Sequence, residues 1–319
     1  MFAIETTGLA KSFRRKRVIC DLDLHVGRGE IYGFVGKNGS GKSTTMKMLA
    51  GLMPPDAGEV RVLGRVMAPC EANPRMGTLI EAPGIYPNLS ALDNMMVKAL
   101  VLGVIDPRDA CMDLLRAVGL DRAGKQRAKH FSMGMKQRLG VALALLGSPD
   151  ILLLDEPMNG LDPEGVRDIR GLIVRLNRER GITVLISSHV LDQLERMCTV
   201  YGVIREGRMV AELTADEVEE ACASCLVLRC AEQSRALAVL AERCPAARLT
   251  ALPGDAVRIE GDVAAEEVGR ALMEEGVVVR DLHRTEGDRE GFFVELMGGR
   301  DVEDAPAPPM GGGRRTGGE

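Results

Sequence analysis

The segment GKNGSGKST at Gly36–Thr44 has the residue types that bind a chain of phosphates. It satisfies the pattern G-x-x-x-x-G-K-[ST], and it lies between an apolar segment, Ile31–Val35, and a segment with helical features, Lys42–Leu52. Glycines let the backbone wrap around phosphates, while the loop amides and the helix N-terminus supply a positive field. We expect Lys42 to reach the β- and γ-phosphates and Ser43 to ligate Mg²⁺. The sequence therefore predicts a P-loop nucleotide site made by Gly36, Asn38, Gly39, Ser40, Gly41, Lys42, Ser43 and Thr44.

Two carboxylates follow the apolar segment Ile151–Leu154. Four aliphatic residues in a row predict a buried strand, and Asp155 and Glu156 lie at its carboxyl end, where open α/β sheets bind ligands. Asp155 is placed to hold Mg²⁺, directly or through water, and Glu156 to orient and deprotonate an attacking water. Alone, the pair could equally be two solvated acids. Combined with the P-loop, it predicts a hydrolytic site.

The elements that must position these residues alternate between apolar strands and helices. This alternation predicts an α/β domain at residues 1–213, with a mostly parallel sheet covered on both faces and a helical subdomain at about 83–147. The expected strands are Ala3–Ala10, Val18–Val26, Ile31–Val35, Glu59–Leu63, Ile151–Leu154 and Thr183–Ser187. The expected helices are Lys42–Leu52, Ala91–Leu102, Arg108–Val118, Met133–Leu146, Pro163–Arg180 and Val190–Cys198.

The character of the sequence changes after Gly207. The segment Thr214–Glu217 fits a capping box that opens a short helix. The order that follows, βαββαβ, predicts a small ferredoxin-like α+β accessory domain at 214–298, which ends in a helix at Arg289–Met297. Its expected elements are Leu226–Cys230, Glu232–Arg243, Arg248–Leu252, Ala256–Glu260, Ala264–Glu275 and Val277–Leu282. We expect the Gly- and Pro-rich tail at 299–319 to be disordered.

Composition excludes several classes of protein. With 319 residues, of which 45% are hydrophobic and 27% charged, the chain can form one large and one small globular domain. A net charge of −5 argues against a nucleic-acid partner. No run reaches the roughly 18 apolar residues of a bilayer span, and the N-terminus lacks the features of a signal peptide. We expect a soluble, cytoplasmic chain whose membrane role, if any, comes through a partner.

Eight cysteines are spread between Cys20 and Cys244 without the density of a disulfide scaffold. Cys222 and Cys225 form a CxxC pair, but no histidine is close in sequence and the spacing does not match a zinc ribbon. Reduced, mostly buried thiols are favoured over a metal or redox site, which remains an open alternative.

Three further segments resemble the ABC ATPase family, in the order the family keeps. Phe131–Arg138 (FSMGMKQR) resembles the LSGGQ signature and its helix, Asn159–Asp162 resembles the D-loop, and Ser188–His189 resembles the switch histidine. Phe13, 29 positions before the P-loop lysine, lies where the family keeps an aromatic ring that stacks on adenine. The resemblance covers about residues 4–207.

The resemblance implies an ATP hydrolase in which two ATPase subunits, as a homodimer or a closely related heterodimer, meet head to tail. Each ATP, with its Mg²⁺, would lie between the P-loop of one subunit and Ser132 and Gly134 of the other. Glu156 would polarise the water, His189 would contact the γ-phosphate, and Asp162 would keep the dimer in register. Integral-membrane permease subunits would convert the opening and closing into transport at the cytoplasmic face of the membrane.

Four positions depart from the family pattern. Glu81 stands where the family usually has glutamine; a carboxylate can ligate Mg²⁺ but cannot donate a hydrogen bond. Met133 and Met135 replace the usual Gly and Gln of the signature, and Lys37 is an exposed change within the P-loop. The surrounding strings are similar to the bacitracin- and lantibiotic-resistance type of ABC ATPase. Members of that type pair with separate membrane subunits and move antimicrobial peptides outward or off the membrane, so substrate choice lies in the permease.

Two alternatives differ in function. An importer ATPase could use the C-terminal domain to sense a transported amino acid. An ABC protein of translation or chromosome maintenance would have a second ATPase cassette or a long coiled coil, and the sequence shows neither.

Overall fold

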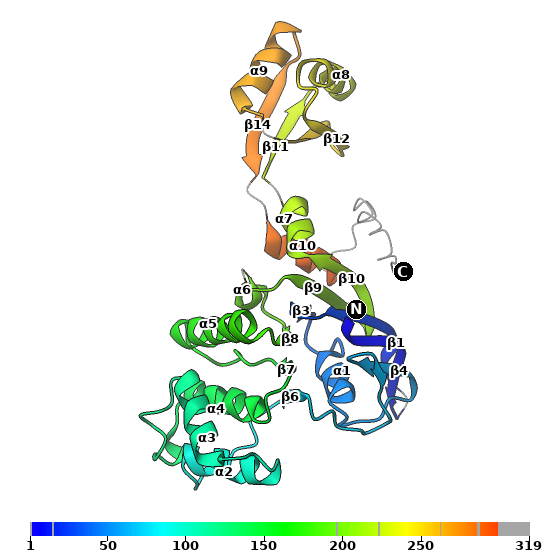
Figure 1. Cartoon of the computed structure of the whole chain (residues 1–319). Helices are drawn as coiled ribbons and strands as arrows, with labels where there is room; N and C mark the ends of the chain where they lie inside the picture. The colour runs from blue at the N-terminus through cyan, green and yellow to red at the C-terminus, as the bar shows by residue number, and fades with distance from the viewer. Residues whose placement is uncertain are drawn as a thin grey trace, which may run out of the picture.

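A six-stranded sheet with the order β10-β9-β3-β8-β7-β6 forms the centre of the molecule (Figure 1). The computed structural model describes residues 2–14, 16–195, 197–222, 224–261, 263–285 and 288–298. Neighbouring strands of this sheet are parallel except at the antiparallel edge strand β10, so the expected mostly parallel sheet is confirmed. Its strands are β3 (Ile31–Val35), β6 (Met76–Leu79), β7 (Ile151–Asp155), β8 (Thr183–Ser188), β9 (Val200–Arg205) and β10 (Arg208–Thr214).

Three strands of this sheet, β6, β9 and β10, are not predicted from the sequence pattern. In β9, Gly202 interrupts the apolar run, which weakens the strand signal. The glycine has a packing role, because a side chain there would overlap the hydroxyl of Tyr32 on the neighbouring strand β3. The close approach of β9 to β3 therefore requires a glycine at position 202, and this glycine is the residue that weakens the strand pattern in the sequence.

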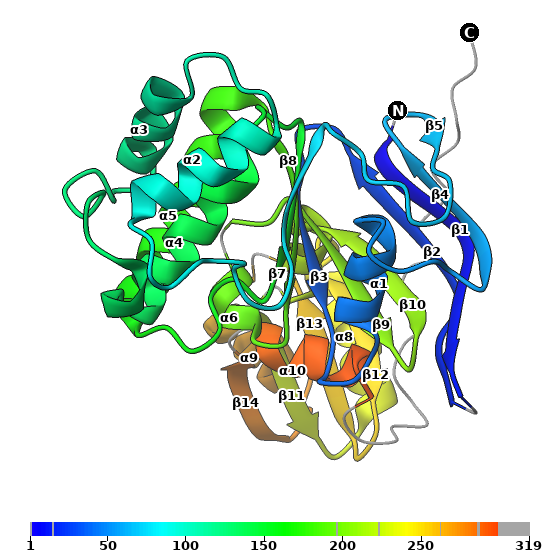
Figure 2. The same ribbon diagram turned by 90° about the horizontal axis from the view of Figure 1, so that it is seen from below.

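Helices lie on both sides of the central sheet. Figure 2 shows α2 to α5 on one side, and α1 with an antiparallel sheet on the other. The helices of this part are α1 (Lys42–Leu49), α2 (Ala91–Val101), α3 (Pro107–Ala117), the 3-10 helix η1 (Ala128–His130), α4 (Met133–Leu145), α5 (Pro163–Arg180) and α6 (Leu191–Leu194). Most of the predicted helix bounds agree to within one residue.

Two predicted helices are too long. The helix predicted to reach Leu52 ends at Leu49, because the amides of Gly51 and Leu52 bond back to the carbonyls of Met48 and Lys47 in the Schellman pattern that closes a helix. Of the helix predicted at 190–198, only α6 forms a helix. It ends at Leu194, because the backbone of Glu195 has an extended ψ of 141°.

The antiparallel sheet, with the order β2-β1-β4-β5, is joined to the central sheet through Glu212 of β10. One oxygen of Glu212 accepts the Tyr32 hydroxyl at 2.6 Å and the His25 backbone amide at 2.9 Å, and the other lies 2.8 Å from the His25 ring. A single carboxylate thus connects β2, β3 and β10. The strands of the antiparallel sheet are β1 (Phe2–Phe13), β2 (Lys16–Gly27), β4 (Ala57–Val62) and β5 (Arg65–Val66).

A smaller α/β unit extends from one end of the molecule (Figure 1). Its four strands are antiparallel, in the order β12-β13-β11-β14, and with its helices they enclose a separate apolar core. The unit consists of β11 (Cys225–Cys230), α8 (Gln233–Arg243), β12 (Arg248–Leu252), β13 (Ala256–Glu260), α9 (Ala265–Glu274) and β14 (Val279–Thr285).

The helices on either side of this unit belong to the larger core. Val218 of α7 (Ala215–Ala221) packs in that core, as do Phe293 of α10 (Arg289–Leu296) and Met297, which directly follows α10. The chain therefore leaves the larger body at α7 and returns to it at α10. The predicted accessory domain at 214–298 includes both helices, and the predicted tail at 299–319 lies outside the described residues. Among the residues that are described, no helix has the length and apolar character needed to cross a membrane.

The Glu212 junction predicts a pH-dependent contribution to stability. The hydrogen bond to Glu212 raises the pKa of His25 above its usual 6.5. A raised pKa in the folded state means that the contribution is complete below about pH 6 and is lost as the pH rises through the folded-state pKa. We expect Glu212→Gln to lower the free energy of unfolding more at pH 6 than at pH 9. Urea denaturation of both proteins across this range measures the difference, with Glu59→Gln as a control for removing an acidic group. An equal loss at every pH would contradict the coupling.

Candidate functional site

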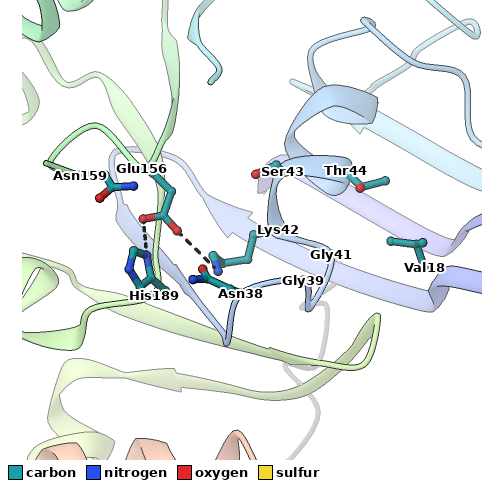
Figure 3. A pocket seen from close by; sticks show the side chains of 10 residues that line it. All are labelled: Val18, Asn38, Gly39, Gly41, Lys42, Ser43, Thr44, Glu156, Asn159 and His189. Carbon is teal, nitrogen blue, oxygen red and sulfur yellow. Dashed lines mark hydrogen bonds and ion pairs between the residues drawn. The ribbon is translucent and has the colours of Figure 1, made fainter. Parts of the chain in front are cut away.

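A pocket of about 510 Å³ opens at the carboxyl ends of β3, β7 and β8 (Figure 3). It gathers the P-loop, the end of β7 and the residue after β8, which are far apart in the chain. Its lining residues are Val18, Asn38, Gly39, Gly41, Lys42, Ser43, Thr44, Glu156, Asn159 and His189. Eight of these ten are predicted site residues.

The P-loop conformation depends on contacts with neighbouring strands. Gly41 has a φ of 114°, and a side chain there would overlap Ile19 of β2. The Ser40 amide donates to the Lys37 carbonyl at 3.1 Å, and the Gly207 amide, in the turn between β9 and β10, donates to the Ser40 carbonyl at 2.9 Å. One hydrogen bond within the loop and one from the β9–β10 turn therefore stabilise the loop conformation.

Lys42 lies at the centre of this loop with its side chain only 5% exposed. Its ammonium donates to the carbonyl of Gly36 at 2.6 Å and to that of Lys37 at 3.3 Å, and it lies 3.5 Å from a carboxylate oxygen of Glu156. Burial lowers the pKa of Lys42 below its usual value, although the charges of Glu156 and Asp155 oppose this shift. The negative groups present thus compensate the buried cation incompletely, which suits a site for an anionic ligand.

The two carboxylates at the carboxyl end of β7 are ordered by Ser187 of β8. The Ser187 hydroxyl donates to Asp155 at 2.6 Å and accepts the Glu156 backbone amide at 3.0 Å. Glu156 has a φ of 50°, an uncommon backbone conformation that turns its side chain away from the strand direction into the pocket, as Figure 3 shows. Its second oxygen lies 2.7 Å from Nδ1 of His189. Lys42, Glu156 and His189 therefore form one continuous polar chain.

Three residues of this site are missing from the predicted set. Ser187 pairs in register with Asp155 across β7 and β8, a relation that no linear motif encodes. Val18 enters the pocket from β2. Asn159 begins the segment that resembles the D-loop, so the sequence contained a signal for it.

Eight predicted residues are not among the residues that line the pocket. Gly36, Ser40 and Asp155 are buried. The other five are Phe13, Glu81, Ser132, Gly134 and Asp162. Phe13 ends β1 with 43% of its surface exposed and has the Lys11 ammonium 6.0 Å from its ring centre. Glu81 is exposed and forms an ion pair with Lys47 of α1.

The remaining residues of this group lie at helix N-termini. Ser132 caps α4 by accepting the Met135 amide at 3.2 Å, and Asp162 caps α5 by accepting the Gly165 amide at 3.0 Å. The ideal Cβ position at Gly134 has no neighbouring atom closer than 3.8 Å, so the start of α4 is sterically open. Their predicted roles in a second subunit's ATP pocket remain predictions.

All eight cysteines carry free thiols. Cys222 is half-buried and Cys225 is buried, with its sulfur 3.2 Å from the Thr285 hydroxyl. Within the part of the chain that the structure describes, no three His, Cys, Asp or Glu side chains are grouped so that they could hold a metal ion.

Known proteins of similar sequence are ABC transporter ATP-binding proteins. Residues 19–159 match the ABC transporter family. An ABC transporter ATP-binding protein of Bacillus subtilis is 36% identical over 94% of this chain and 99% of its own length. The bacitracin transport ATP-binding protein BcrA of Bacillus licheniformis is 35% identical over 93% of this chain and 97% of its own length. The lantibiotic transport ATP-binding protein SrtF of Streptococcus pyogenes is 39% identical over 68% of this chain and 93% of its own length.

Solved structures agree with this fold. An ATP-binding subunit of an ABC transporter is 29% identical, covers 68% of this chain and 92% of its own, and has a TM-score of 0.60. The cassette MJ0796, solved as a dimer with ADP and phosphate, is 23% identical, covers 66% of this chain and 98% of its own, and also has a TM-score of 0.60.

The position of Ser187 predicts a specific loss of activity. Ser187→Ala removes the hydroxyl that orients Asp155 and the Glu156 backbone, so we expect the rate of ATP hydrolysis to fall about tenfold. The free energy of unfolding should fall by about 1–2 kcal/mol. Phosphate release and thermal denaturation measure the two effects. Thr6→Val, which removes another buried hydroxyl that bonds the Leu22 carbonyl in the antiparallel sheet, should lower stability but leave the hydrolysis rate unchanged. Equal rates for Ser187→Ala and the wild type would refute the orienting role.

Proposed function

The chain belongs to the ABC transporter ATP-binding proteins, and we propose that it powers the export or clearance of antimicrobial peptides such as bacitracin or lantibiotics. It is an ATP-hydrolysing subunit, as the match to the family and the ABC ATPase fold establish. The observation that carries the finer proposal is the near full-length similarity to bacitracin transport ATP-binding proteins, which includes the small C-terminal unit. The importer alternative is not favoured by these relatives.

The pocket supports a role for Lys42 in holding the β- and γ-phosphates of ATP. Its ammonium is buried and incompletely compensated, and the first residues of α1 line the same pocket. Phosphate oxygens would supply the missing negative charge. Asn38, Gly39, Gly41, Ser43 and Thr44 line the same pocket and would contact the phosphate chain.

Ser43 and Asp155 would hold Mg²⁺. Their hydroxyl and carboxylate oxygens are the hard donors that Mg²⁺ prefers, and Ser43 lines the pocket where Asp155 ends the adjoining strand. When bound, Mg²⁺ would neutralise charge on the phosphates. Glu81, a third predicted ligand, would have to leave its ion pair with Lys47 to contribute.

Glu156 and His189 are placed to act on the attacking water. The carboxylate of Glu156 would accept a proton from that water, and His189, 2.7 Å away, would orient the carboxylate and contact the γ-phosphate. The left-handed backbone at Glu156 aims the side chain into the pocket, where Figure 3 shows it between Lys42 and His189. Positioning and charge stabilisation, rather than covalent chemistry, would then accelerate hydrolysis.

A second ATPase subunit would complete the pocket. Related cassettes form dimers, and we propose the head-to-tail form for this chain. The sterically open N-terminus of α4, with Ser132 and Gly134, would face the γ-phosphate bound by the partner's P-loop. Asp162 would hold the register of the two subunits, and Phe13 would stack on adenine after a movement of the β1–β2 hairpin.

Permease subunits would provide the membrane path, with this chain at the cytoplasmic face of the membrane. We also propose a division of the chain based on packing. The ATPase domain would comprise residues 1–222 together with α10, and the accessory unit would comprise Cys225–Thr285. The strand order β12-β13-β11-β14 and the βαββαβ sequence of elements support a ferredoxin-like assignment for this unit.

Two substitutions separate binding from hydrolysis. Glu156→Gln should bind ATP, hydrolyse it at least about a hundredfold more slowly and accumulate as a dimer, because the base is lost while the phosphate contacts remain. Lys42→Ala should lose most ATP affinity. Nucleotide titration, phosphate release and size-exclusion chromatography with ATP and Mg²⁺ measure these effects. Hydrolysis at the wild-type rate by Glu156→Gln would exclude it as the base.

The substrate proposal predicts a phenotype. A susceptible bacterium that produces this chain with its permease should tolerate more bacitracin or lantibiotic than one that produces Glu156→Gln with the same permease. Minimal inhibitory concentrations measure the difference. Equal susceptibility of the two strains to every peptide tested, with an active ATPase, would exclude these substrates.

A further inference from the structure

The helix α10 connects the C-terminal end of the described chain with the nucleotide-binding body. Phe293 is buried and packs edge-on against Tyr201 of β9, with 5.3 Å between ring centres. At the other end of the helix, Arg289 forms an ion pair with Glu195 at 3.4 Å. Glu195 directly follows α6, and α6 begins two residues after His189. In Figure 1, α10 lies between the body and the α/β unit.

The carboxyl end of α10 meets two cations from the body. Arg205, the last residue of β9, donates to the Leu296 carbonyl at 3.5 Å, and Lys37 donates to the Gly298 carbonyl at 3.2 Å. The Leu296 carbonyl is a free carbonyl at the helix C-terminus, where partial negative charge is stabilised by a cation, whereas Gly298 lies two residues beyond the end of α10. Lys37 is the second residue of the P-loop, and it is one of the departures from the family pattern.

The backbone of Lys37 takes part in the phosphate-binding loop itself. Its carbonyl accepts the Ser40 amide at 3.1 Å and the Lys42 ammonium at 3.3 Å. The side chain of the same residue points away from the pocket to α10, since it does not line the pocket and bonds Gly298. Lys37 thus connects the P-loop, through its backbone carbonyl, to the residue Gly298 that follows α10, through its side chain.

We propose that Lys37 is a positioning residue for ATP binding, which ties the P-loop to the carboxyl end of α10. The docking of α10 then favours the loop conformation that receives phosphates. The inference rests on the proposed role of the P-loop in binding ATP. Because coupling between two sites is reciprocal, bound ATP also strengthens the docking of α10. As β14 leads directly into α10, the α/β unit is connected to the nucleotide site through this helix.

The test uses the full-length chain with Lys37→Met, which keeps the aliphatic stem but removes the ammonium. We expect the KM for ATP to rise about three- to tenfold, the effect of one lost hydrogen bond to a charged group, with kcat changed less than about twofold. Lys37→Arg should restore the KM, since a guanidinium can also donate a hydrogen bond to the Gly298 carbonyl. Lys125→Met, which removes one exposed cation that does not line the pocket, is the matched control.

Hydrogen exchange gives a second readout that a purely structural role would not change. ATP with Mg²⁺ should slow exchange of the α10 amides in the wild type and not in Lys37→Met. Wild-type values of both KM and α10 protection in Lys37→Met would overturn the inference. Lys42→Ala distinguishes this result from failure of the site itself: if the wild type binds ATP and Lys42→Ala does not, the P-loop role stands and only the role of Lys37 has failed.

Discussion

A buried cation is the constraint on which the rest of the site depends. The Lys42 ammonium is almost inaccessible to water, and burial of a charge without compensation is costly. Backbone carbonyls of the loop supply part of the compensation, and Glu156 supplies another part. The P-loop, the end of β7 and the residue after β8 must therefore meet at one edge of the sheet.

The sheet meets this requirement through its register. Parallel pairing aligns the ends of β7 and β8, so that the Ser187 hydroxyl lies between the side chain of Asp155 and the backbone amide of Glu156. The β9–β10 turn supports the loop from the other side through the Gly207 amide. Strands without catalytic side chains thus determine the geometry of the site as much as those that carry them.

The position of α10 changes how the C-terminal part of the chain is understood. The α/β unit has its own core, but the helices before and after it pack on the ATPase body. It is therefore attached at two points rather than one. A chain that leaves and returns in this way can transmit a change in either part to the other, and Lys37 of the P-loop bonds the Gly298 carbonyl just beyond α10.

The sequence by itself determined the chemistry and most of the elements. The P-loop, the carboxylates Asp155 and Glu156, and the strands and helices around them follow from local patterns, because phosphate binding needs glycines, an amine and a helix start within nine consecutive residues. Only the tertiary structure decided the contacts of Ser187, the place of β9 and the docking of α10 beside Lys37. Those depend on strand register and on side-chain packing between segments up to 261 positions apart, for which a single sequence carries no local signal.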